Sequence, residues 1–421
     1  MSTSEAFYEQ LLDIRAPWRV ARVALNKPAQ RVDVYLEHRE RARWKCPRCG
    51  QEHGAYDHAI ERVWRHRDSC EYATYLNARL PRVACAGEYR ELQAPWAEGH
   101  SRFTIAQERR CIDTLLECDV TGAAHLTGLG WSSLWLIVER AVRRGRERKA
   151  RALPVRLGVD EKSFGKFHRY ETLVYDLGKG TVEYVADERT MESLSSYFRQ
   201  FSPTELTAVQ AVAMDMWEPY IQAVRASIPD AEKKIVFDRF HAMKYATDAV
   251  DKTRRREHKD LSERNDTVLA GTRHLWLWSA ENIPEDRREE FEALKAENLK
   301  VGRAWSLKES LRELWLQTSL ENARKFFKHW YFWATHSRLP AMVKAAKTLH
   351  AHAAGLLNFA VHRITNACAE GLNSKIETVK KMACGFRNRK HYRTMIYFHC
   401  GGLDLYPAPL PFHSTACDHN L

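Results

Sequence analysis

Val155-Arg-Leu-Gly-Val-Asp160 and Val209-Gln-Ala-Val-Ala-Met-Asp215 are two short, mostly apolar runs that each end at an aspartate. Runs of this length and composition predict buried strands of a sheet. An unpaired aspartate where such a strand meets a loop is costly unless it binds something. If the two strands are neighbours, their carboxylates converge and suit a hard divalent cation. The alternative is a pair of ordinary turn-forming aspartates.

The segments around these two runs complete an α/β pattern. Gly178-Lys-Gly180 separates two further strand-like segments and predicts a hairpin. Helical patterns at about 191–201 and 217–227 alternate with the strands. The predicted strands are 155–160, 171–177, 181–186, 209–215 and 235–240. Three consecutive strands followed by alternating helices and strands predict an α/β sheet with helical cover.

Residues 241 to about 360 show helical patterns throughout and are rich in tryptophan, at positions 276, 278, 305, 315, 330 and 333. We expect these rings mainly to form a core, with stacking on unpaired bases as the functional alternative. Two more helices are predicted near 366–383 and 388–400. Glu370, at the start of the first of them, is the candidate for a third carboxylate beside Asp160 and Asp215.

Cys46-Pro-Arg-Cys49 is the clearest metal motif near the N-terminus. Two thiolates at this spacing can face one tetrahedral zinc ion, but they make only half a site. Cys85 is the expected third ligand, and the remaining candidates lie within the same segment: His53, His58, His66, Cys70 and Glu88. Two incidental cysteines are the alternative. A disulfide framework is not expected from the ten cysteines of a chain in a reducing compartment.

The segment 105–150 has the dimensions of a helix-turn-helix domain. It contains a helix, the turn Gly128-Leu-Gly130 and a final helix that ends in a basic run, with seven Arg or Lys among residues 140–151. A helix that enters the major groove while basic side chains hold phosphates requires this pattern. The candidates for DNA binding are Arg140, Arg143, Arg144, Arg146, Arg148 and Lys149. A solvated charged helix is the alternative.

Length and composition restrict the class of protein. The chain has 421 residues, 44% of them hydrophobic, which is enough for several cores and excludes wholesale disorder. Its formal net charge of +12 favours a polyanionic partner, most often nucleic acid, although a basic enzyme with a solvated surface fits equally well. The sequence shows neither a membrane span nor a signal peptide, so we expect a cytosolic protein without membrane partners.

Four blocks of the chain resemble the DDE transposases of bacterial insertion sequences, and most closely the ISL-three family. They are GVDEKSFG (158–165), VAMDMWEPYIQAV (212–224), FDRFHAMKYATDAVDKTRR (237–255) and NACAEGLNSKIETVKKMACGFRN (366–388). The N-terminal half agrees, with CPRCG, PRVAC (81–85) and APWAEGHSRFT (94–104). One departure concerns zinc, because the family usually has a Cys-x-x-His pair where this chain has Cys85-Ala-Gly-Glu88. Three alternatives follow: either Glu88 serves as the fourth ligand, or a nearby histidine replaces it, or zinc binding is weakened or lost.

The resemblance implies a ribonuclease-H-like catalytic fold in which Asp160, Asp215 and Glu370 hold two magnesium or manganese ions. These ions would support cleavage and joining of DNA strands without a covalent protein intermediate. Asp238-Arg-Phe-His241 is another block of the family. It could position DNA or support the metal site, or His241 could cap the following helix.

The implied protein is a transposase that binds the inverted repeats at the ends of its element and the target DNA, as a dimer or larger assembly near the bacterial nucleoid. The rival hypothesis is a catalytically silent DNA-binding regulator, which would usually have lost one of the three carboxylates. An RNA-binding protein is a third alternative, without a visible RNA-recognition motif. The expected division is a zinc-binding segment (1–103), a helix-turn-helix domain (104–152), a catalytic domain in two parts (153–245 and 361–405), a helical insertion (246–360) and a tail (406–421).

Overall fold

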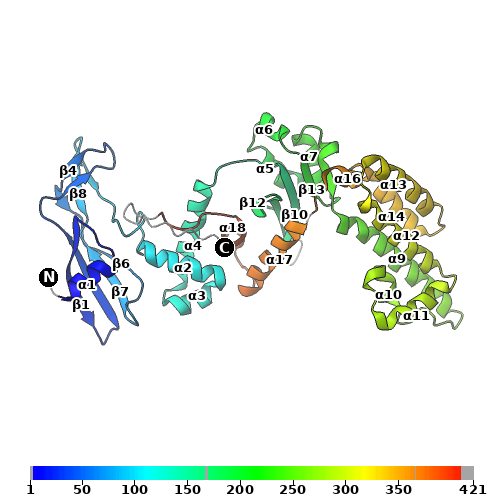
Figure 1. Ribbon diagram of the computed structural model, residues 1–421, viewed down its shortest axis with the longest axis horizontal. Helices are drawn as coiled ribbons and strands as arrows, with labels where there is room; N and C mark the ends of the chain where they lie inside the picture. Colours follow the sequence, from blue (N-terminus) through cyan, green and yellow to red (C-terminus); the bar gives the residue numbers. More distant parts are fainter. Residues whose placement is uncertain (1–2, 166–168, 366, 409–421) are drawn as a thin grey trace.

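A five-stranded mixed sheet lies at the centre of the chain. The computed structural model describes residues 3–165, 169–365 and 367–408, so most of the expected tail lies outside the described residues. Figure 1 shows an elongated molecule, with the N-terminal strands at one end, a helical insertion at the other and this sheet between them. Among the described residues, no helix has the length and apolar character needed to cross a membrane.

The sheet has the strand order β12-β11-β10-β13-β14, and all five strands were predicted from the sequence. The first three are antiparallel neighbours, whereas β13 and β14 run parallel to β10. Their bounds are β10 (Arg156–Gly165), β11 (Arg169–Asp176), β12 (Thr181–Asp187), β13 (Ala211–Met214) and β14 (Ile235–Phe237). Every residue of β13 and β14 is buried, as expected for parallel strands covered on both faces.

The two faces of the sheet pack into different cores. Val174 of β11 faces a core with α5 (Met191–Phe198) and α7 (Glu218–Ser227). Its neighbours Leu173 and Tyr175 face the opposite core, because successive side chains of a strand point to opposite faces. Helices α17 (Ala367–Met382) and α18 (Arg389–Cys400) pack on this face and contribute to that second core. The short helices α6 (Pro203–Thr207) and α8 (Ala231–Lys234) complete this part of the chain.

The helical insertion begins directly after β14. Helix α9 (Arg239–Ser262) is capped by Asp238, so the boundary expected between residues 245 and 246 falls inside one continuous helix. The insertion continues with α10 (Arg273–Leu277), α11 (Glu285–Ala296), α12 (Lys300–Arg312), α13 (Leu320–Thr335), α14 (Pro340–Ala351), α15 (Ala353–Leu357) and α16 (Phe359–His362). The predicted tryptophan core is confirmed for positions 276, 305, 315 and 330, which are buried, while Trp333 is exposed.

The N-terminal part consists of helix α1 (Thr3–Leu11), a four-stranded sheet and two small hairpin sheets. The larger sheet has the order β1-β2-β7-β6, formed by Trp18–Asn26, Arg31–His38, Ala73–Ala78 and Arg62–Arg65. The smaller ones contain β3 (Arg43–Lys45) with β4 (Glu52–Gly54), and β5 (Asp57–His58) with β8 (Pro81–Cys85) and β9 (Glu88–Glu91). The segment 72–85, predicted as strand, is divided between β7 and β8.

The three helices α2 (Ile105–Glu117), α3 (Val120–Thr127) and α4 (Trp131–Arg148) share a core with the end of the chain. Leu134 and Val138 of α4 belong to the same cluster of buried side chains as Ile396 of α18. Gly145 shows how close the approach is, because a Cβ atom there would lie 2.6 Å from Leu403 Cβ. A boundary at residue 152 therefore divides one hydrophobic core, and we do not expect residues 1–152 to fold alone.

Glu171 of β11 fixes helix α18 to the sheet. Its fully buried carboxylate accepts hydrogen bonds from Arg389 Nε at 2.6 Å and from Arg393 Nε at 2.8 Å. Asp187, at the end of β12, also forms ion pairs with both arginines. Two guanidinium groups are thus neutralised at the edge of the core, where a single unpaired charge would be costly.

We predict that Glu171→Ala lowers the free energy of unfolding by about 3 kcal/mol, because it leaves two partly buried arginines with only one shared partner. The measurement is urea denaturation of the full chain. Glu192→Ala is the matched control. Glu192 lies on α5 and forms an exposed ion pair with Arg199, the residue that follows this helix. The control should leave the unfolding midpoint nearly unchanged. Equal effects of the two substitutions would contradict a special role of Glu171.

Candidate active site and DNA-binding elements

Asp160 and Asp215 meet at the edge of the parallel part of the sheet. The register pairs Gly158 of β10 with Ala213 of β13, so two residues further along each strand Asp160 lies beside Asp215. Glu161 joins them, and one carboxylate oxygen from each of the three residues lies within 4.8 Å of the other two. The convergence expected for the two aspartates is therefore present, with an additional carboxylate that the sequence analysis missed.

Burial and neighbouring negative charge oppose ionisation of two members of this carboxylate cluster, Asp160 and Glu161. Burial raises the pKa of Asp160 to about 6, and the nearby charge of Asp215 adds to the shift. Burial also raises the pKa of Glu161. Arg189 donates a hydrogen bond to Glu161 Oε1 at 2.9 Å, but Glu161 Oε2 is buried and has no hydrogen-bond partner among the described residues. Clustered oxygen ligands with unsatisfied lone pairs fit a hard divalent cation.

His241 lies against the same cluster. Its Nδ1 atom is 2.6 Å from Asp215 Oδ1 and 3.5 Å from Asp238 Oδ1, and these two carboxylates raise the pKa of His241 to about 10. Capping of the helix belongs to Asp238, whose Oδ1 accepts hydrogen bonds from the backbone N–H groups of Phe240 and His241. The imidazolium of His241 is thus the counter-charge of Asp215 in this structure.

Glu370 lies near the cluster but is not part of it. It is exposed on the first turn of α17, outside the group of converging carboxylates. One turn later on the same helix, Asn373 donates a hydrogen bond to Asp160 Oδ2 at 2.6 Å and accepts one from the Tyr175 hydroxyl at 2.7 Å. Asn373 therefore anchors the helix that carries Glu370 to the end of β10. The i, i+3 spacing of Glu370 and Asn373 places them on one face of a helix, but it does not identify the partner of Asn373.

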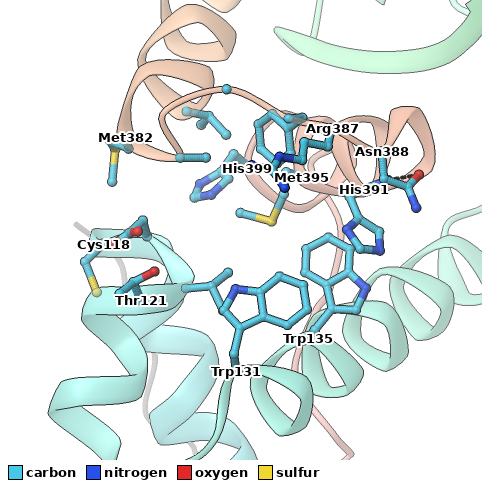
Figure 2. Close-up of a pocket in the computed structure, with 16 residues that line it drawn as sticks. Cys118, Thr121, Trp131, Trp135, Met382, Arg387, Asn388, His391, Met395 and His399 are labelled. Atoms are coloured by element: carbon cyan, nitrogen blue, oxygen red, sulfur yellow. Dashed lines mark hydrogen bonds between the residues drawn. The ribbon is translucent and has the colours of Figure 1, made fainter.

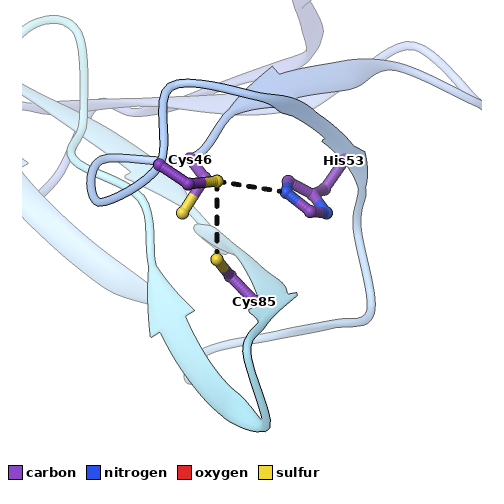
Figure 3. Close-up of side chains that lie close together, drawn as sticks. Cys46, His53 and Cys85 are labelled. Carbon is purple, nitrogen blue, oxygen red and sulfur yellow. Dashed lines mark hydrogen bonds between the residues drawn. The ribbon is translucent and has the colours of Figure 1, made fainter.

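Three cysteines and a histidine converge between the two small hairpin sheets (Figure 3). The ligand atoms of Cys46, Cys49, His53 and Cys85 all lie within 4.8 Å of one another, and Figure 3 shows the side chains of Cys46, His53 and Cys85 close together. Cys49 Sγ is 3.5 Å from both Cys85 Sγ and His53 Nε2. The backbone N–H groups of Cys49 and Arg48 lower the pKa of the Cys46 thiol to about 7. Three thiols and one imidazole are a donor set typical of structural zinc.

Of the alternatives left open for the fourth ligand, the cluster agrees with a nearby histidine, His53, and it does not include Glu88. Glu88 forms ion pairs with Arg48 and Arg90 instead, although it pairs with Cys85 across the β8–β9 hairpin. His53 takes the position because β3 and β4 form a hairpin that returns it to the cysteine knuckle, with Trp44 and His53 as register partners. His53 was one of several histidines that the sequence offered, and spacing alone could not select it.

The basic run of α4 is mostly engaged within the chain. Arg144 is buried and binds Glu98, Glu108 and the backbone oxygen of Leu405. The other engaged cations pair as follows: Arg140 with Glu108, Arg148 with Asp404 and Lys149 with Glu183. In the described part of the chain, Arg143 and Arg146 form no ion pair, and both are exposed. The prediction that Arg144 contacts DNA is wrong for this conformation, because its guanidinium is not accessible.

The first turns of α4 pack against the C-terminal helices around a cavity of about 410 Å³ (Figure 2). Trp131 and Trp135 are stacked at a ring distance of 5.6 Å, and Trp135 lies 4.0 Å from the ring of His391 on α18. Met382 and Arg387, near the end of α17, line the opposite side. Helix α4, the last helix of the helix-turn-helix segment, is therefore in direct contact with the helices that lead to Glu370 and Asn373.

Comparison with known proteins agrees with this arrangement. A transposase family model of the DDE type and the ISL3 group matches residues 157–396. The zinc-finger of transposases IS204, IS1001, IS1096 and IS1165 matches residues 42–87, and the helix-turn-helix domain of transposase family ISL3 matches residues 92–142.

Two similar relatives cover most of the chain. The transposase for insertion sequence element IS1001 of Bordetella parapertussis is 25% identical over 371 residues, which are 87% of this chain and 90% of the relative. The transposase for insertion sequence element IS1557 of Mycobacterium tuberculosis is 26% identical over 370 residues, covering 82% of this chain and 83% of the relative. The family model covers more than half of the chain, and the carboxylate-bearing sheet and the cluster of cysteines and histidine agree with it, so the chain belongs to the ISL3 family of transposases.

Proposed function

We propose that this protein binds the terminal inverted repeats of an insertion sequence and carries out metal-dependent cleavage and transfer of DNA strands. The observation that carries the proposal is the convergence of Asp160 and Asp215 at the edge of the sheet, next to the helix of Glu370. We also propose a ribonuclease-H-like catalytic fold. It is supported by three antiparallel strands followed by two strands parallel to the first.

In the proposed site, Asp160, Asp215 and Glu370 hold magnesium or manganese. Bound divalent cations supply activation of the attacking oxygen and stabilisation of the leaving oxygen in phosphoryl transfer. The chain itself positions the carboxylates. Asn373 fixes one oxygen of Asp160 by a hydrogen bond, and Tyr175 fixes Asn373. His241 holds Asp215 by an ion pair and offsets its charge.

The rival function is a DNA-binding regulator without catalytic activity. Loss of one carboxylate would favour it, but Asp160, Asp215 and Glu370 are all present in the sequence. The partly buried carboxylate cluster also argues against it, since a binding protein gains nothing from Asp160 and Glu161, two acidic groups whose burial opposes their charge.

We predict that Asp160→Asn and Asp215→Asn each reduce cleavage of end-containing DNA on the order of a thousandfold or more, because each removes a metal-binding charge without changing shape. DNA binding should survive in both variants. The measurement is a cleavage assay with labelled element ends, paired with a gel-shift titration. Cleavage that persists within about tenfold of the unmodified protein would exclude the altered residue as a metal ligand.

The same assay distinguishes the two candidates for the third carboxylate. Glu370→Gln should reduce cleavage as strongly as the two aspartate substitutions do. Glu161→Gln should retain most of the cleavage activity, because Glu161 is already paired with Arg189. The opposite ranking would assign the third ligand to Glu161. Both variants remove one negative charge near the same sheet edge, so each controls for the electrostatic effect of the other.

We further propose that Cys46, Cys49, His53 and Cys85 hold a structural zinc ion. We predict that the purified full chain contains close to one equivalent, and that His53→Ala lowers this to below about half an equivalent, because metal binding and folding of a small site are coupled. Glu88→Ala is the matched control and should retain its zinc. The measurement is elemental analysis after dialysis. Loss of zinc in the control but not in His53→Ala would restore Glu88 as the ligand.

For DNA binding we propose Arg143 and Arg146, the two exposed candidates that form no ion pair among the described residues. Replacing both with glutamine should reduce the slope of log affinity against log salt by up to about two, because each phosphate contact contributes roughly 0.9. Arg144→Gln should instead lower the thermal stability of the protein, since it leaves the buried Glu108 with one arginine fewer. Gel-shift titrations at several salt concentrations and thermal melts separate these effects. An unchanged slope in the double variant would exclude this surface.

A further inference from the structure

The helical insertion has a strongly uneven distribution of charge. The hairpin of α13 and α14, residues 320–351, contains six Lys and Arg side chains and one acidic residue, Glu321. The region of α11, residues 281–297, contains three Lys and Arg side chains and seven acidic residues. Figure 1 shows α13 and α11 at opposite ends of the insertion. One end is therefore basic and the other acidic.

The pairing of these charges differs as much as their number. All three cations of α11 form ion pairs with acidic residues of the same helix: Arg287 with Glu290, Arg288 with Glu285 and Lys295 with Glu292. On the hairpin, Lys325 pairs with Glu321. The other five cations are exposed and form no ion pair within the residues that the structure describes: Arg324, Lys328, Arg338, Lys344 and Lys347.

Three of the unpaired cations surround one shallow groove. Arg338 comes from the loop before α14, and Lys344 and Lys347 lie one turn apart on that helix. Pro340, Val343 and Thr348 form the rest of the lining, which contains no acidic residue. Phe332 and Trp333, at the end of α13, are also exposed, at 61% and 43%. The groove thus presents three cations without an acidic side chain beside them.

We propose that the groove of Arg338, Lys344 and Lys347 binds the phosphate backbone of duplex DNA, as a DNA-binding surface separate from the helix-turn-helix domain. Repeated cations without intramolecular partners are the chemistry that phosphates require, and releasing counterions from DNA favours the contact. The placement supports DNA over an acidic protein. In Figure 1 the sheet lies between α2–α4 and the insertion, so a duplex that contacts both would pass the sheet.

The test uses the full chain and a duplex of random sequence, without divalent cations, so that its outcome does not depend on the proposed catalysis. In the variant with Arg338→Gln, Lys344→Gln and Lys347→Gln, the slope of log affinity against log salt should fall by up to about 2.7, with affinity reduced about tenfold or more near 0.1 M salt. Fluorescence anisotropy titrations at several salt concentrations measure both quantities. The preference for inverted repeats over random DNA should be retained, because phosphate contacts carry no sequence information.

The matched control replaces Arg287, Arg288 and Lys295 with glutamine. It removes the same charge from the same insertion, but from side chains that are already paired. Its slope should stay within about 0.5 of the unmodified protein. An equal loss in both variants would mean that only net charge matters and would overturn the proposal. Polyglutamate serves as the probe for an acidic protein partner. An unchanged DNA slope in the groove variant would overturn the proposal as well, whether or not that variant binds polyglutamate more weakly.

Discussion

The close approach of Asp160 and Asp215 is the constraint on which the rest of the catalytic region depends. Parallel pairing of β10 and β13 forces the two carboxylates together, and Glu161 adds a third within 4.8 Å. Burial opposes the charge of Asp160 and Glu161, so the site is stable only with compensating groups around it. His241, Arg189 and Asn373 provide them, from α9, from the segment before α5 and from α17. Elements that are far apart in the sequence are thereby held at one edge of the sheet.

Helix α4 of the helix-turn-helix segment is connected to the carboxylate cluster through the two C-terminal helices. On helix α17, Asn373 is hydrogen-bonded to Asp160. At the end of the same helix, Met382 lines the cavity beside Trp131 and Trp135. Because α4 shares its core with α18, a movement of the helix-turn-helix domain cannot leave the C-terminal helices unaffected. Packed helices transmit displacement as rigid elements. Helix α4 and the helix that carries Glu370 therefore contribute side chains to one hydrophobic core.

The sequence predicted the strands of the central sheet, the convergence of the two aspartates and the clustering of the three cysteines, because each depends on local pattern or short spacing. Glu161, Asn373 and His53 could not be selected in this way, since their roles arise from strand register, helix packing and a hairpin that only the folded chain defines. The basic run of α4 illustrates the opposite error. The charge of this run suggested a DNA-binding surface, but Arg144 is buried and forms ion pairs with Glu98 and Glu108. Composition shows that cations are present, and only the structure shows which ones already have partners.

The same distinction explains why the insertion is more than a spacer. Its buried tryptophans account for stability, since Trp276, Trp305, Trp315 and Trp330 are enclosed among apolar side chains. They do not account for the polarity of its surface, where paired charges surround α11 and unpaired cations surround α14. Unpaired cations close together repel one another, and a fold gains no stability from collecting them. Their concentration at one end is therefore better explained by an external polyanion than by the requirements of folding.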